Sequence, residues 1–199
     1  MPRVTEEHRA ARRDRITDAA IRAFAERGFQ HTSMADIMSE AQVSAGGVYG
    51  HFASKREIAV EVATRVLGAR RADIEAARAA DPVPEPIDLV MAVLRSMRME
   101  MHDSRLVVQL WAEASVDDEM RAIVSAAFAT YLRHSLTGYF GGWAQQARHL
   151  SAGAAADWAE LVVPGVIGMI QGYIVQSALL DDFDGERYLA SLAQLLPHH

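Results

Sequence analysis

The chain has 199 residues, half of them apolar, so it is long enough to bury one good core and too apolar to be disordered. It has no cysteine, which excludes disulfides, thiolate catalysis and cysteine-based metal sites and suits a reducing cytoplasm. The net charge of -6 is uneven: residues 1–71 hold 12 Lys and Arg against 9 Asp and Glu, whereas the remainder holds 8 against 17. A basic N-terminal part on an acidic body suggests that only the former meets an anion.

Two helices are predicted first. Apolar residues recur at three- and four-residue spacing over 16–24, and Gly28 follows where a C-cap would end that helix. Ser33, with Asp36 three residues later, forms a capping-box pattern in which Asp replaces the usual Glu or Gln. This pattern predicts a short second helix that runs to about Ala41.

A third helix is expected over the segment SAGGVYGHF, residues 44–52, with Ser44 as its N-cap. Three glycines lie in this segment: Gly46, Gly47 and Gly50. Each costs a helix about 1 kcal/mol relative to Ala. So many glycines in one short helix indicate that something approaches its backbone closely.

A long fourth helix is predicted from Ser54 to about Ala80, and the three prolines of DPVPEP at 81–86 mark a linker. Further helices are expected near 87–101, 104–115, 118–148, 153–180 and 185–196. No alternating strand pattern of useful length and no internal repeat is present. We therefore predict an all-α protein with a three-helix N-terminal domain at 9–54, joined by the fourth helix to a larger helical domain at 55–199.

Residues 161–180 form an uncharged run of a length that spans a bilayer. Pro164, two glutamines and four small residues argue against a membrane and favour a helix covered on all sides by protein. Gly168 and Gly172 would let another helix approach. We therefore expect no membrane and a homodimer built from the helices near 153–180 and 185–196. The residues expected to meet the partner are Gly165, Gly168, Met169, Gly172, Tyr173, Leu189 and Leu192.

Two short helices joined by a tight turn at 41–43 form a helix-turn-helix motif at about 34–53, whose second helix would enter the DNA major groove. The segments RDRITDAAIRAFAERGF, TSMADIMSEAQVS and GGVYGHFASKREI resemble the tetracycline-repressor (TetR) family of bacterial regulators without a gap from residue 12 to about 60. LVVQLWAEASVDDEMRAIV is similar to the ligand-binding domain of the betaine-regulator-like branch. The resemblance implies a cytoplasmic, homodimeric transcriptional repressor that leaves its double-stranded DNA operator when a small-molecule effector binds.

The same resemblance implies DNA contacts of three kinds: phosphate contacts at the starts of the second and fourth helices, base-facing positions on the third helix, and aromatic residues that bond phosphates. The residues are Thr32, Ser33, Gln42, Ser44, Ala45, Gly46, Gly47, Tyr49, His51 and Lys55. At Gly46 a side chain would collide with the sugar-phosphate chain. Gln42 stands where relatives usually carry Gly, so we predict a positive φ there, with its amide a candidate for a phosphate. Tyr49 could instead pack; Val48 and Phe52 are expected to do so.

A ligand cavity is expected in the larger domain, because methionines at helical spacing adapt to different guests. The relatives bind a small molecule in this domain. An ordinary apolar core is the alternative interpretation of the same residues. The candidate lining is Met91, Leu94, Met97, Met101, Leu110, Trp111, Phe128, Tyr131, Leu132, Trp158 and Val162.

Catalysis is not expected. The sequence has no G-x-S-x-G, H-E-x-x-H or Walker lysine motif, and DDFDGE at 181–186 lacks the spacing of a calcium loop. We therefore predict no enzyme activity, no cofactor and no metal. The alternative function is a helical ligand-binding or architectural protein whose DNA module is not used for site-specific regulation.

Overall fold

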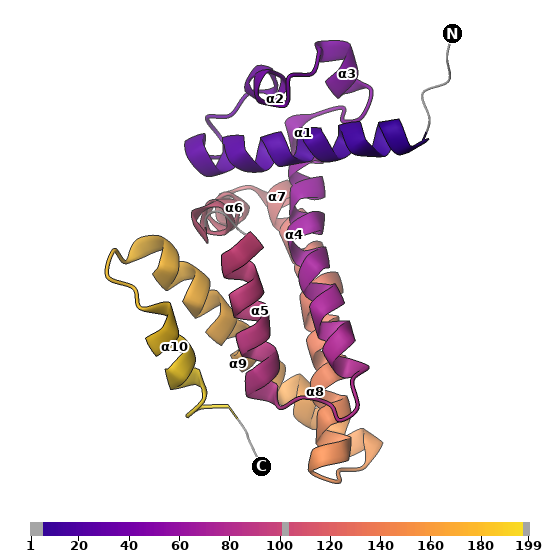
Figure 1. Ribbon diagram of the computed structural model, residues 1–199, viewed down its shortest axis with the longest axis vertical. Coiled ribbons are helices and arrows are strands. Elements are labelled where there is room, and N and C mark those ends of the chain that lie inside the picture. Colours follow the sequence, from indigo (N-terminus) through magenta and orange to yellow (C-terminus); the bar gives the residue numbers. More distant parts are fainter. Residues whose placement is uncertain (1–5, 101–103, 197–199) are drawn as a thin grey trace. The chain divides into compact units, whose positions relative to one another are not determined.

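The computed structural model describes residues 6–100 and 104–196, which form helices and no strand (Figure 1). The all-α prediction is confirmed. The helices are α1 (Glu6–Arg27), α2 (Met34–Ala41), α3 (Ala45–Tyr49), α4 (Lys55–Arg78), α5 (Pro86–Glu100), α6 (Ser104–Val116), α7 (Asp118–Phe128), α8 (His134–Ala147), α9 (Ala152–Leu179) and α10 (Gly185–Leu192).

Two compact units divide these helices. The N-terminal unit comprises the residues up to 65 together with 109–124, and the C-terminal unit comprises 66–108 with the residues from 125 onward. These units are defined by how tightly their residues pack, not by what they bind. The expected division between a DNA-binding and a ligand-binding domain at residue 54 therefore stays a prediction.

In the N-terminal unit, α2 and α3 lie on the same side of α1 (Figure 1). The apolar spacing of α1 buries one face of that helix, including Ile16, Ala20 and Phe24, at 0% exposure. Val48 and Phe52 are also fully buried, which confirms their predicted packing role. Burial of these side chains fixes the two short helices, which are too short to be stable alone.

The C-terminal unit is organised around α9, which packs against α8 and α10. Tyr173 of α9 meets the rings of Phe183 and Tyr188 edge-on or tilted, at centroid distances of 5.2 and 5.5 Å. Tyr139 of α8 donates a hydrogen bond of 2.5 Å to the carbonyl of Pro84 and so holds the 81–86 linker. These contacts join segments that are far apart in the sequence.

Three predicted helix boundaries differ from the structure. The third helix ends at Tyr49, because Gly50 serves as its C-cap and the chain then turns. The single helix expected over 118–148 has a π-helical turn at Ala129–Arg133, between α7 and α8. The last helix ends at Leu192 instead of 196. Periodicity locates a helix well but does not detect a wide turn within it.

One helix within the described residues, α9, is long and apolar enough to cross a membrane by length and composition alone, with a mean hydropathy of 1.4. A third of its most apolar window is buried, and Pro164 lies inside the helix. Core helices of soluble proteins meet the same criteria of length and composition.

Candidate nucleic-acid interface

Helix α2 begins with the predicted capping box. The backbone N–H of Asp36 donates to Ser33 Oγ at 3.1 Å, and the backbone N–H and hydroxyl of Ser33 donate to the Asp36 carboxylate at 2.8 and 2.6 Å. These bonds to Ser33 lower the pKa of Asp36 from its ordinary value. The short aspartate closes the box as a glutamate would. The start of α2 is therefore fixed by local chemistry.

The turn after α2 depends on Gln42, which adopts φ 53° and ψ 44°. This confirms the predicted positive φ. The left-handed conformation directs the N–H of Gln42 to Ser39 O at 3.2 Å and that of Val43 to Met38 O at 3.1 Å. The Gln42 side chain is exposed, so its amide is free to reach a ligand.

Two glycines of helix α3 differ in the space available for a side chain. The N-cap Ser44 accepts a 3.3 Å bond from the Gly47 N–H. A Cβ at Gly47 would lie 2.5 Å from Val43 Cγ1, whereas a Cβ at Gly46 would meet nothing within 4 Å. A side chain at Gly47 would therefore crowd Val43, a neighbour in the chain. A side chain at Gly46 would crowd no such neighbour, and both Gly46 and Ala45 are exposed.

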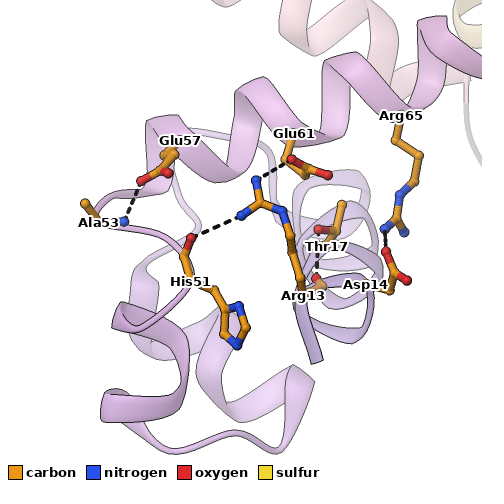
Figure 2. A network of polar contacts seen from close by, with 8 residues as sticks. All are labelled: Arg13, Asp14, Thr17, His51, Ala53, Glu57, Glu61 and Arg65. Carbon is orange, nitrogen blue, oxygen red and sulfur yellow. Dashed lines mark hydrogen bonds and ion pairs between the residues drawn. The ribbon is translucent and has the colours of Figure 1, made fainter. Parts of the chain in front are cut away.

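The end of α3 is fastened to α1 and α4 by Arg13. Its guanidinium donates to His51 O at 3.2 Å and pairs with Glu61 at 2.5 Å (Figure 2). It also lies 4.4 Å from the centroid of the Phe52 ring. Tyr49, in contrast, is 54% exposed. The arrangement holds α3 rigidly while leaving the Tyr49 ring accessible to a partner.

Two predicted phosphate contacts point into the protein. Thr32 is 1% exposed, and its hydroxyl lies 2.8 Å from Gly28 O and 3.1 Å from Ala23 O. The ammonium of Lys55 donates to Phe29 O at 2.7 Å and lies over the Phe29 ring. Burial lowers the pKa of Lys55 from its ordinary value. In this structure both side chains hold the α1–α2 loop in place.

Arg13 was not among the predicted site residues. Its signal in the sequence is the basic run on α1, but charge alone does not distinguish an arginine that braces the fold from one that meets a ligand. A second brace was also missed: Arg56 of α4 pairs with Asp117 at 2.5 Å and with Glu119. These partners lie 61 and 63 positions along the chain, beyond the reach of any local pattern.

The predicted ligand-binding residues are divided between the units. Leu110 and Trp111 belong to the N-terminal unit, and Met101 lies outside the described residues. The others lie in the C-terminal unit, where they are buried or partly buried: Met91, Leu94, Met97, Phe128, Tyr131, Leu132, Trp158 and Val162. Trp158 packs against the buried cluster of Trp143, Ala144 and Ala155. The cavity therefore stays a prediction.

The predicted dimer residues fall into two groups. Tyr173, Leu189 and Leu192 are buried within the chain, so the expectation that they meet a partner needs correction: they join α9 to α10. Gly165 and Gly168 are exposed, and a Cβ at either would meet nothing within 4 Å. Gly172 instead faces the Tyr188 hydroxyl, 2.6 Å from its ideal Cβ position, while Met169 is partly buried.

Within the residues that the structure describes, no group of three or more His, Asp or Glu side chains is arranged to hold a metal ion.

Comparison with known proteins supports a regulatory role. The sequence profile described as bacterial regulatory proteins, tetR family, matches residues 16–62. The chain is 28% identical to the HTH-type transcriptional regulator BetI of Rhizobium meliloti (strain 1021) over 183 residues, covering 90% of this chain and 83% of that protein. It is 42% identical to the HTH-type transcriptional regulator YfiR of Bacillus subtilis (strain 168), but that match spans only 28% of YfiR. These relatives are transcriptional regulators, not enzymes.

Among solved structures, the chain is similar to the transcriptional regulator FadR of Bacillus subtilis in complex with stearoyl-CoA. The TM-score is 0.72 at 18% identity, with 92% of this chain and 96% of FadR covered. At this identity the likeness concerns the fold alone. The similarity in fold includes the helices of both units and is not confined to the helix-turn-helix.

Proposed function

Because the chain belongs to the TetR family of bacterial regulators, we propose that it is a transcriptional repressor that binds a DNA operator through α3 and releases it when a small molecule binds. The observation that carries this proposal is the division of α3 into two faces. Val48 is fully buried, whereas Ala45, Gly46 and Tyr49 are exposed. As the second helix of a helix-turn-helix, α3 would lie in the major groove with this open face towards the bases.

Specificity then comes from few direct contacts. Ser44, Ala45 and Gly46 begin α3 and offer short side chains or none, so long bidentate contacts to base edges are absent from this face. Apolar contact with thymine methyls and DNA shape supply the remaining discrimination. The exposed Tyr49 hydroxyl and the Gln42 amide are the phosphate contacts that the geometry favours.

The repressor works as a homodimer in this proposal. The outward face of α9 carries exposed Leu161, Gly165, Gly168 and Leu179 at helical spacing. The two glycines permit close approach of a helix, and the leucines supply apolar surface. To bind successive major grooves, the two α3 helices of such a dimer would have to lie about 34–36 Å apart.

The effector is proposed to bind in the larger domain, 55–199, and the protein to work in the cytoplasm. Its partners are thus double-stranded DNA, a small molecule of unspecified class and a second copy of itself. Release of DNA requires that the effector bind the released geometry better than the DNA-bound one, by about 1–3 kcal/mol for a typical coupling. The candidate lining residues named above are where that difference would arise.

The test is a selection of fragments of the source genome on the purified full-length protein, followed by footprinting of the fragments recovered. The proposal expects a small set of two-fold symmetric sites with half-sites about one helical turn apart. Recovery of fragments without a common site would overturn it and would favour the alternative, a helical protein whose DNA module serves no site-specific regulation.

Two substitutions, tested on a recovered DNA fragment, distinguish DNA binding from the response to effector. Tyr49→Phe removes one phosphate hydrogen bond, so it should weaken DNA binding across several salt concentrations and leave effector affinity unchanged. Trp111→Ala should alter the response to effector while the ligand-free protein still holds its DNA. Equal DNA affinity of Tyr49→Phe and wild type would contradict the placement of Tyr49 on the phosphates.

A further inference from the structure

A cleft of about 190 Å³ lies in the N-terminal unit between the first turns of α1 and the helix α3. It is smaller than the roughly 300–1,000 Å³ that drug-sized ligands need. It is nevertheless several times the ~30 Å³ that one water occupies in the liquid. The cleft therefore has room for an oxyanion of phosphate size with a few waters.

The lining of the cleft is cationic. Side chains from α1 and the residue after α3 surround a floor of bare backbone, and the lining residues are His8, Arg9, Arg12, Gly46, Gly47, Gly50 and His51. No acidic residue is among them. Arginine forks match the geometry of phosphate oxygens, and glycines leave the backbone open to close approach. This composition favours an oxyanion over a neutral or cationic ligand.

The arginines of α1 divide by partner. Arg13, Arg22 and Arg27 pair with Glu61, Glu40 and Asp36. Arg9 and Arg12, the two that line the cleft, have no carboxylate partner within the described residues. The charges that face the cleft are therefore not neutralised by the fold.

The backbone of His51 is held by Arg13, whereas its imidazole ring faces the cleft. Its carbonyl accepts the bond from Arg13, and in Figure 2 the imidazole extends away from that guanidinium. The residue is partly buried. The backbone is thus fixed by the brace, while the ring contributes to the cleft lining.

We propose that this cleft binds one phosphate-type oxyanion, with Arg9 and Arg12 as charged donors and His51 as a donor that takes up a proton when the oxyanion binds. A phosphate of the DNA backbone is one source, because the cleft floor is the same α3 that would face the bases. Free inorganic phosphate offers the same chemistry. The DNA source rests on the proposed function, whereas the inorganic source does not.

The electrostatics supports the proton uptake. Burial, and then the positive charges of Arg9, Arg12 and Arg13, lower the pKa of His51 below its ordinary value of 6.5. The imidazole is therefore neutral at neutral pH. His8 lies in the same lining, and Glu61 pairs with Arg13. An oxyanion offsets the arginines and favours the imidazolium, so affinity rises as pH falls.

The first experiment measures binding of a labelled, mixed-sequence duplex of about 30 base pairs, or three helical turns, by fluorescence anisotropy between about pH 7.5 and about pH 6. Wild-type affinity should rise by about tenfold over this range, and His51→Gln should lose most of that dependence. His149→Asn, an exposed histidine at positive φ in the other unit, is the control and should behave as wild type.

Arginine variants test the charged donors. Arg9→Gln and Arg12→Gln should each lower the salt dependence of binding by about one released counterion per subunit. Arg15→Gln removes the same charge from an exposed position of the same helix, outside the cleft lining. It should therefore cost less affinity than either.

The second experiment observes the His51 imidazole itself, and its phosphate arm does not depend on DNA binding. The His51 imidazole signal of the full chain, assigned by its absence from His51→Gln, is titrated by proton NMR with inorganic phosphate and with chloride at equal ionic strength. A rise of the His51 titration midpoint in phosphate identifies a site open to the free ion. A rise only with duplex DNA identifies the backbone as the source.

The outcomes separate this proposal from the proposed function. If neither phosphate nor DNA raises the His51 midpoint, or if His51→Gln retains the full pH dependence, the cleft is not an oxyanion site. If the protein selects no genomic sites but responds to phosphate, the oxyanion site stands and the proposed regulatory function fails. If it binds specific DNA without pH dependence, the regulatory function stands and the oxyanion site fails.

Discussion

The turn between α2 and α3 and the long helix α9 are opposite cases. In the turn, the capping box at Ser33 and the left-handed Gln42 were both expected and both occur. On α9, Tyr173 was expected to face a partner but is buried against the rings of Phe183 and Tyr188 instead. Caps and turns depend on residues within about four positions, whereas the covered face of a helix depends on distant segments. Caps and turns can therefore be predicted from the sequence, whereas the packing partners of a helix face cannot.

The largest expected effect comes from the face of α9. Gly165→Leu with Gly168→Leu adds side chains that meet nothing within the chain. If a second copy packs there, four added leucines per dimer should cost roughly 4 kcal/mol, about a thousandfold in the dimer dissociation constant. Analytical ultracentrifugation over a range of concentrations measures this.

Gly153→Leu is the control, since it also enters open space on α9, in its first turn. It should leave the dimer unchanged. A wild-type protein that is monomeric at micromolar concentration would end the dimer proposal outright. Gly172→Leu is a poor probe, because Gly172 faces Tyr188 within the chain.

The next effect contrasts two threonines. Thr32→Val leaves the carbonyl oxygens of Gly28 and Ala23 without their hydroxyl donor, which should lower the free energy of unfolding by about 1–3 kcal/mol. Thr137 Oγ1, in the C-terminal unit, is buried with no hydrogen-bond partner among the described residues. Thr137→Val should therefore be neutral or stabilising.

Urea unfolding followed by circular dichroism, at one fixed protein concentration, compares the two valine variants. Equal losses would mean that the Thr32 hydroxyl contributes nothing beyond its volume. Such a result would return Thr32 to the list of side chains available to a phosphate.

Gly47→Ala should be destabilising although alanine is the better helix former. Its Cβ would lie 2.5 Å from Val43 Cγ1, and relieving such overlap costs about 1–3 kcal/mol, more than the roughly 1 kcal/mol of helix propensity gained. Val43→Ala in the same chain should restore the loss. A stable Gly47→Ala single variant in urea unfolding would show that Val43 moves aside freely.

The smallest effect is at Gln42. Gln42→Gly should raise the free energy of unfolding by up to about 1 kcal/mol, because glycine adopts positive φ without strain. His149, with φ 53°, is a matched position in the C-terminal unit, and His149→Gly should gain similarly. Thermal unfolding of both variants checks this; a loss at Gln42 alone would indicate that its side chain stabilises the turn.

These contrasts explain how much of the protein was predictable. The starts of α2 and α3 followed from Ser33 and Ser44, whose hydroxyls bond backbone atoms nearby, and the positive φ of Gln42 followed from the glycine that relatives carry there. The inward orientation of Lys55 did not, because its acceptor Phe29 O lies 26 residues away. Resemblance places a residue in a motif, but the rotamer depends on contacts that this chain makes for itself. For the same reason, the sequence did not predict the contacts of Arg13 or the cationic cleft.

The central claim is that DNA approaches the backbone of α3, and Gly46→Ala tests it most directly. A Cβ at Gly46 meets nothing within 4 Å, so this variant should be more stable than wild type by up to about 1 kcal/mol. Gly142→Ala on α8 enters equally open space and is the control. Both are titrated against a duplex recovered by genomic selection. If DNA approaches this backbone, Gly46→Ala, although more stable, binds about tenfold more weakly while Gly142→Ala binds as wild type. Equal affinity of all three proteins would contradict the close approach.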